Sequence, residues 1–133
     1  MEQSVLSGHQ RDELVAAIRA TVGEDLRSVT YFTEDTVDQL YRRSDLEQTA
    51  DLAGFAAMER RGFDAQTRYA NTQLGVYQFT IRVFEWGYLT RVIDDSHGIW
   101  VTTDHMSIDR FEELAVAIRS ILRSIDGPTD GSC

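Results

Sequence analysis

The stretch of sequence that decides the fold is VYQFTIRVFEWGYLTRVIDDSHGIWVTT, residues 76–103. Apolar and polar residues alternate along 76–85, which is the period of two of a half-buried strand. Gly87 can adopt a positive φ for a tight hairpin turn, after which the chain returns as a second strand. Turn-forming residues at 94–98 precede a third run, 99–103, that is rich in β-branched residues. The stretch therefore predicts a three-stranded antiparallel meander.

A long amphipathic helix is predicted after the meander. Apolar residues recur at intervals of three and four from 108 to 125, and Ser107 can cap the first turn. The charged residues between them include Asp109, Glu112, Glu113, Arg119 and Arg123. Because the apolar stripe must leave water, we expect this helix to cover one face of the sheet.

Four shorter elements are predicted before the meander. A first helix is expected over 9–22, where the apolar positions share one face and Gly23 follows as a stop. Strand-forming residues near 27–32 predict a fourth strand. Two short helices are expected in the middle of the chain, and they need separate arguments.

The first middle helix is predicted from Val37, Leu40 and Tyr41, whose spacing gives a short apolar face that ends near Arg42-Arg43. The second is predicted over 51–62, where Gly62 ends a helix that buries Phe55 with Met58 or Glu59.

The sequence thus predicts one α+β domain over 9–125, between a disordered N-terminus (1–8) and a disordered tail (126–133). Its four-stranded antiparallel sheet combines the meander 76–103 with the strand near 27–32. One face is expected to be fully covered by the first and last helices. The other face carries more apolar residues than the two middle helices need.

The composition indicates a halophilic origin. All 13 basic residues are Arg, 22 residues are acidic, and the formal net charge of the 133 residues is -9. Complete absence of Lys fits a genome of high GC content, and an acidic surface stays hydrated in molar salt. With no apolar run long enough to span a bilayer and no signal peptide at the start, we expect a cytoplasmic protein of a halophilic archaeon, without membrane contact.

Nucleic acid is disfavoured as a partner, but only weakly. Phosphate binding relies on clustered basic residues, which a strongly acidic chain does not favour. In molar salt, however, charges are screened beyond about 3 Å. A DNA-associated regulator therefore stays an alternative, and it requires one exposed face that carries Arg42, Arg43, Arg60 and Arg61.

No motif of catalysis, cofactor binding or metal binding is found. There is no nucleophile elbow, phosphate-binding glycine loop or dinucleotide fingerprint, and Cys133 stands alone at the end of the sequence. His97 and His105 lie near Asp94 and Asp104, but their spacing matches no zinc or calcium pattern. We therefore expect a non-enzymatic protein with no catalytic residues, cofactor or metal.

Two small groups of residues are candidates for binding. Trp86 at the hairpin tip, with Phe84 and Leu89, is a candidate partner contact because exposed aromatic residues often anchor interfaces. Arg82 and Arg91 can lie opposite or diagonal on adjacent strands and form an anion-binding pair. The alternative for this pair is that each guanidinium bonds to a carboxylate of the chain itself.

The chain resembles a small uncharacterised domain family of haloarchaea. The resemblance rests on the following segments: Leu26-Arg27-Ser28-Val29-Thr30-Tyr31-Phe32, Gln39-Leu40-Tyr41, Asp45-Leu46, Glu59-Arg60, Gly62-Phe63, Tyr77, Thr80-Ile81-Arg82 and Val101-Thr102-Thr103-Asp104. The order of elements is also similar to roadblock or longin-like domains, which use a sheet and helices as dimerisation and partner surfaces. The chain departs from that pattern in showing one strand, not two, between the first helix and the middle helices.

The leading functional hypothesis is a cytoplasmic module that binds another protein or a second copy of itself. A small anionic-ligand sensor using Arg82 and Arg91 is the first alternative, and the DNA-associated regulator is the second.

Overall fold

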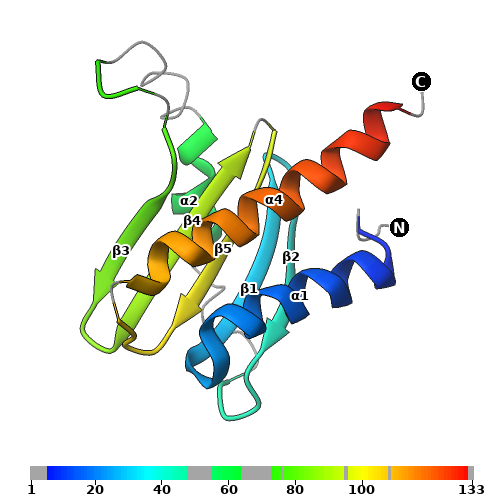
Figure 1. Ribbon diagram of the computed structural model, residues 1–133. Coiled ribbons are helices and arrows are strands. Elements are labelled where there is room, and N and C mark those ends of the chain that lie inside the picture. Colours follow the sequence, from blue (N-terminus) through cyan, green and yellow to red (C-terminus); the bar gives the residue numbers. More distant parts are fainter. Residues whose placement is uncertain are drawn as a thin grey trace.

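Five antiparallel strands and three helices make up the described part of the chain (Figure 1). The computed structural model describes residues 6–47, 55–63, 73–75, 77–94, 96–107 and 109–131, without the side chains of 56, 57, 60 and 126–131. In chain order the elements are α1 (Gly8–Val22), the 3-10 turn η1 (Gly23–Asp25), β1 (Leu26–Thr33), β2 (Val37–Arg42), α2 (Phe55–Arg60), β3 (Thr80–Phe84), β4 (Gly87–Asp94), β5 (His97–Thr103) and α4 (Asp109–Gly131).

The sheet has the strand order β2-β1-β5-β4-β3, so the meander β3–β5 is confirmed and β1 joins it beside β5. α1 and α4 lie side by side on one face, and α2 lies on the other (Figure 1). The α+β class is confirmed, but the sheet has five strands where the sequence predicted four.

The additional strand is β2, and the helix predicted there is wrong. The Thr33 N–H donates to the Thr36 carbonyl oxygen at 2.9 Å, which closes a hairpin, and the Thr33 hydroxyl accepts hydrogen bonds from the backbone N–H groups of Asp35 and Thr36. β2 then pairs antiparallel with β1, with a register shift between Val29 and Thr30. Because of this bulge, Leu40 and Tyr41 both pack against the same core cluster. The irregular strand therefore has the apolar spacing of a helix.

The two ends of the domain also differ from the prediction. Ser7, expected to be disordered, caps α1 in a reciprocal capping box with Gln10, and Leu6 is buried in the core. At the other end α4 continues past Ile125 to Gly131. Pro128 has no backbone N–H group to donate. Because it lies close to the end of the helix, the missing hydrogen bond affects only the last turns.

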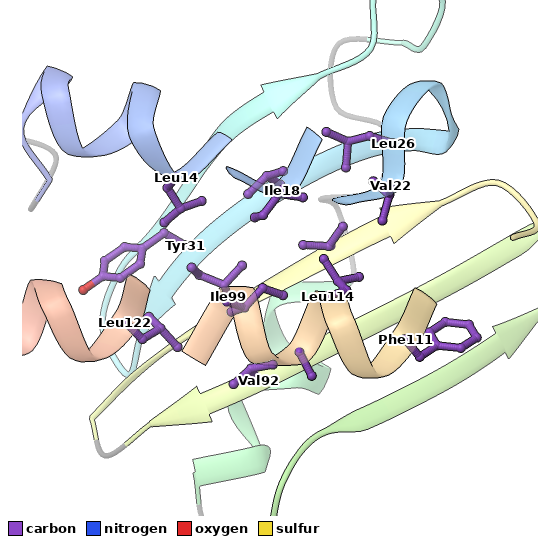
Figure 2. Close-up of a cluster of buried hydrophobic side chains, with 14 of the residues drawn as sticks. Leu14, Ile18, Val22, Leu26, Tyr31, Val92, Ile99, Phe111, Leu114 and Leu122 are labelled. Carbon is purple, nitrogen blue, oxygen red and sulfur yellow. The ribbon is translucent and has the colours of Figure 1, made fainter. Parts of the chain in front are cut away.

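The main core lies between the sheet and the two long helices. Figure 2 shows Leu14 and Ile18 of α1 and Leu114 and Leu122 of α4 converging on Ile99 of the sheet. Their side chains are all fully buried. This confirms that the first and last helices share one face of the sheet.

A smaller core lies on the opposite face. It contains Phe32, Phe63, Leu89, Ile93 and Trp100, with Phe55 of α2 packed against it. Phe63 follows Gly62, which approaches the sheet so closely that an added Cβ would lie 2.6 Å from the terminal methyl of Ile93. The apolar surplus on this face is therefore used to hold the segment around α2.

Gly87 begins β4 for a different reason from the one expected. Its φ is not positive, but a Cβ at this position would lie 2.2 Å from the carbonyl oxygen of Thr103 on β5. Close approach of two strands, rather than a left-handed conformation, is what requires glycine here. Phe84 and Gly87 are paired, so Glu85 and Trp86 form a two-residue turn.

Candidate functional site

The hairpin between β3 and β4 presents an aromatic tip. Trp86 is 75% exposed and Phe84 is 46% exposed, whereas Leu89 is 1% exposed and packs in the smaller core. Trp86 lies in the two-residue turn and belongs to neither core cluster. Of the three residues predicted as a partner contact, the structure therefore brings two to the surface.

A pocket of about 380 Å³ opens beside this tip. Phe55 of α2 stacks on Phe84, with ring centroids 6.0 Å apart and an angle of 14° between the planes. The lining residues are Arg27, Phe55, Phe84, Trp86, Gly87, Tyr88, Thr102 and Thr103. The stacked pair and the exposed Trp86 all line this pocket. We call Phe55, Phe84 and Trp86 the aromatic surface.

Arg82 and Arg91 lie on the same face of the sheet, on neighbouring strands, in a diagonal relation. Between them lies the carboxylate of Glu59, which is 2% exposed. One carboxylate oxygen accepts from Arg82 Nε at 2.6 Å and the other from Arg91 at 2.9 Å. The pair does hold an anion, and that anion belongs to the chain itself.

Arg91 is bound by further groups on its other side. Its second terminal nitrogen donates to the hydroxyls of Thr80, at 2.8 Å, and Tyr77, at 3.2 Å. The side chain is 6% exposed, so these partners replace water around a buried charge. The network connects α2 to β3 and β4, and its role in this arrangement is to position α2 on the sheet.

Sequence reasoning identified the two arginines but not the residue between them. The helical spacing allows either Met58 or Glu59 as the inward position, and the structure places Glu59 inward and Met58 outward, at 47% exposure. That the two arginines face the same helix follows from the strand register and the packing of α2, so no local pattern of the sequence pointed to Glu59. A buried guanidinium needs a carboxylate, and Glu59 is the acidic residue in the segment that packs there.

A second hollow, which the sequence did not predict, lies on the face that carries the long helices. α1 and α4 do not extend over β3, and a groove of about 790 Å³ remains between β3 and α4. It is lined by Phe79, Ile81, Asp109, Phe111, Glu112, Glu113, Val116 and Ala117. Val83 and Val116 nearby are 72% and 65% exposed. The expectation that this face is fully covered is therefore wrong at its β3 edge.

His97 and His105 lie in different surroundings. His97 Nδ1 is 2.8 Å from the Tyr31 hydroxyl in the core, whereas His105 Nε2 is 3.1 Å from the Glu85 carbonyl oxygen near the surface. Among the described residues, no group of three or more His, Cys, Asp or Glu side chains is arranged to hold a metal ion.

Two of the four arginines required for a DNA-binding face, Arg42 and Arg43, have side-chain contacts within the chain. Arg43 donates to both carboxylate oxygens of Asp104, at 2.7 and 3.3 Å, and to Asp45 at 2.7 Å. These bonds raise the pKa of Arg43 and lower the pKa of the Asp45 carboxyl. Arg42 donates to the Leu46 carbonyl oxygen, while the side chain of Arg60 lies outside the described residues.

In the part of the chain that the structure describes, no helix is both long enough and apolar enough to cross a membrane.

Three solved structures of MglB proteins share this fold. "MglB with tetrameric arrangement" aligns with a TM-score of 0.63 at 16% sequence identity, over 94% of this chain and 99% of that chain. The gliding protein MglB from Thermus thermophilus aligns with a TM-score of 0.64 at 14% sequence identity, over 93% of this chain and 99% of that chain. Myxococcus xanthus MglB aligns with a TM-score of 0.58 at 13% sequence identity, over 92% of this chain and 96% of that chain.

These neighbours support the similarity to roadblock and longin-like domains at the level of the fold. The strand that seemed to be missing from that pattern is β2, so two strands do lie between α1 and α2. The departure inferred from the sequence came from the wrong helix prediction. No curated protein matches the sequence.

One family model matches residues 12–123, which span every element from within α1 to within α4. The chain belongs to the family described as a domain of unknown function, DUF7522.

Proposed function

We propose that this protein is a non-enzymatic regulatory or protein-interaction module that contacts a partner protein through the aromatic surface. The observation that carries the proposal is the 75% exposure of Trp86 at a two-residue turn, beside a pocket lined by two stacked phenylalanines. Exposed tryptophans next to preformed apolar pockets are typical of residues that dominate binding energy in protein interfaces.

The fold of the neighbours is consistent with this role. One neighbour is an MglB in a tetrameric arrangement and another is a gliding protein. In this chain the two arginines that an anion sensor needs bind Glu59, and Arg43 binds Asp104. No observation therefore favours the anion-sensor or the DNA-regulator alternative over protein binding.

We also propose that the module works in the cytoplasm of a halophilic archaeon. The support is compositional: 22 acidic residues, a net charge of -9 and arginine as the only strongly basic residue type. In such a cytoplasm long-range charge attraction is screened, so partner recognition relies on apolar contact of the kind that the aromatic surface offers.

The test is quantitative affinity purification at native salt with wild type and two variants. Trp86→Arg places a charge in the centre of the aromatic surface and should abolish the capture of specific partners. Leu74→Arg is the matched control, because Leu74 is 97% exposed and is not among the residues that line the pocket beside Trp86. If the same proteins are captured by all three forms, or none is captured reproducibly, the proposal is wrong.

A further inference from the structure

Between Asp109 and Arg123, the outward stripe of α4 carries charges whose sign reverses about Val116. Val116 lies at the centre and is 65% exposed. Asp109 precedes it by seven residues and Arg123 follows it by seven, while Glu113 and Arg119 each stand three residues away. At 100° per residue these positions fall on one side of the helix. One half of the stripe is therefore acidic and the other half is basic.

Such a pattern is complementary to itself when a second helix runs antiparallel. A two-fold axis through Val116 places Asp109 opposite the partner's Arg123, and Glu113 opposite the partner's Arg119. Each contact occurs twice because a two-fold interface uses the same patch on both copies. Antiparallel alignment also places each helix N-terminus, with its partial positive charge, beside the C-terminal half of the other helix.

The surface around Val116 supplies apolar area for the same contact. Val116 lines two adjoining grooves between α4 and the β3 side of the sheet, and Phe79 lies in both. Ile81 and Val83 continue this apolar surface along β3, where neither long helix covers them. An uncovered apolar strip between an acidic and a basic end is typical of an interaction site rather than a solvated face.

The basic half is also held in place within the chain. Arg119 donates to the carbonyl oxygen of Gln78, and its guanidinium lies 4.0 Å from the Asp94 carboxylate. Its side chain is 19% exposed and extends toward the β3 side, the side of the grooves. Arg123 is exposed, as is Asp109. The outer pair of the stripe, Asp109 with Arg123, therefore offers the sharper test.

We propose that two copies of this chain associate through their α4 helices, antiparallel about Val116, with the uncovered apolar strip along β3 against the partner. This self-association uses a surface different from the aromatic surface, so each can fail without the other. The interface leaves Trp86 available, and a dimer would present two aromatic surfaces to other proteins.

The first experiment is sedimentation equilibrium of the full chain in about 0.1 M and about 1 M KCl, where screening differs strongly. Wild type should dimerise in both. Val116→Arg brings two like charges together on the axis and should raise the dissociation constant by about 100-fold or more. Ser124→Arg adds the same charge to an exposed position of α4 outside the stripe, and should leave the constant within about threefold.

The second experiment uses charge reversal, whose logic is specific to the proposed alignment. Asp109→Arg alone should weaken the dimer, because it faces the partner's Arg123. Arg123→Asp alone should weaken it equally, because it faces the partner's Asp109. The double variant restores both ion pairs with their charges exchanged and should dimerise like the wild type. An equal mixture of the two single variants should form a mixed dimer, because every position 109 then faces an opposite charge at position 123 of the other variant.

The mixture separates interface loss from helix damage, since a misfolded single variant would not be rescued by the other. A wild type that is monomeric in both salts overturns the proposal. So does a dimer that Val116→Arg leaves intact, or single variants that neither weaken association nor recover on mixing.

Discussion

At the scale of single residues, Glu59 and Arg91 form the contact on which the packing of α2 most depends. Both are almost fully buried, and their 2.9 Å bond joins α2 to the centre of the smaller core face. A buried ion pair is not a strong net source of stability, because both charges lose their hydration. Its removal on one side only is costly, because the remaining charge keeps no adequate partner.

Glu59→Ala should therefore destabilise the fold by roughly 3–5 kcal/mol, since Arg91 stays buried without its carboxylate. Replacing both partners by apolar residues of similar size, Glu59→Leu with Arg91→Met, should recover most of the loss. Denaturant unfolding of the wild type and the two variants measures both effects. Equal losses in the single and the double variant would show that the bond is not what makes Glu59 important.

At the scale of elements, the β1–β2 hairpin is the feature that depends most on a few polar atoms. The Thr33 hydroxyl accepts from two backbone N–H groups, at 3.2 Å from Asp35 and 3.0 Å from Thr36, and contacts the Thr36 hydroxyl at 2.8 Å. A Thr at a helix N-cap would accept from the same two N–H groups, so the hydroxyl stabilises the turn without deciding between helix and hairpin. The backbone bond from the Thr33 N–H to the Thr36 carbonyl oxygen, at 2.9 Å, and the pairing of the following residues with β1 make this segment a hairpin.

Thr33→Val keeps the shape and strand preference of the side chain but removes both acceptor bonds. We expect a loss of about 1–2 kcal/mol in unfolding free energy, comparable to the loss of a helix cap. Thr36→Val removes only the contact between the hydroxyls and should cost about 0.5 kcal/mol or less. Urea titration compares them, and an equal cost for both would contradict the role given to Thr33.

At the scale of the whole molecule, the acidic surface should make stability depend on salt. A net charge of -9 on 133 residues produces self-repulsion in the compact state. Raising KCl from about 0.1 M to about 1 M shortens the screening length from about 10 Å to about 3 Å, so the melting temperature should rise.

The matched control is a variant with two exposed carboxylates neutralised, Asp12→Asn and Glu47→Gln. Its melting temperature should rise less than that of the wild type when the same amount of KCl is added. Thermal unfolding followed by circular dichroism gives both values. A melting temperature that stays constant or falls with salt would remove the support that composition gives to a halophilic origin.

The sequence by itself determined the meander, β1 and the two long helices. Their patterns are local: strict alternation along β3, β-branched runs in β1 and β5, and a regular stripe along α4. It also contains the Ser7–Gln10 capping box of α1. It places Trp86 at a hairpin tip. Each of these follows from residues within a few positions of one another.

Only the tertiary structure decided β2, the partner of the two arginines and the extent of coverage by the helices. β2 is a strand because β1 offers a free edge and its bulge permits two neighbouring apolar residues on one face. Glu59 meets Arg82 and Arg91 across more than twenty positions of sequence. The groove beside β3 exists because two helices cover a five-stranded sheet incompletely. All three depend on which segments become neighbours in space, and spacing along the chain carries no record of that.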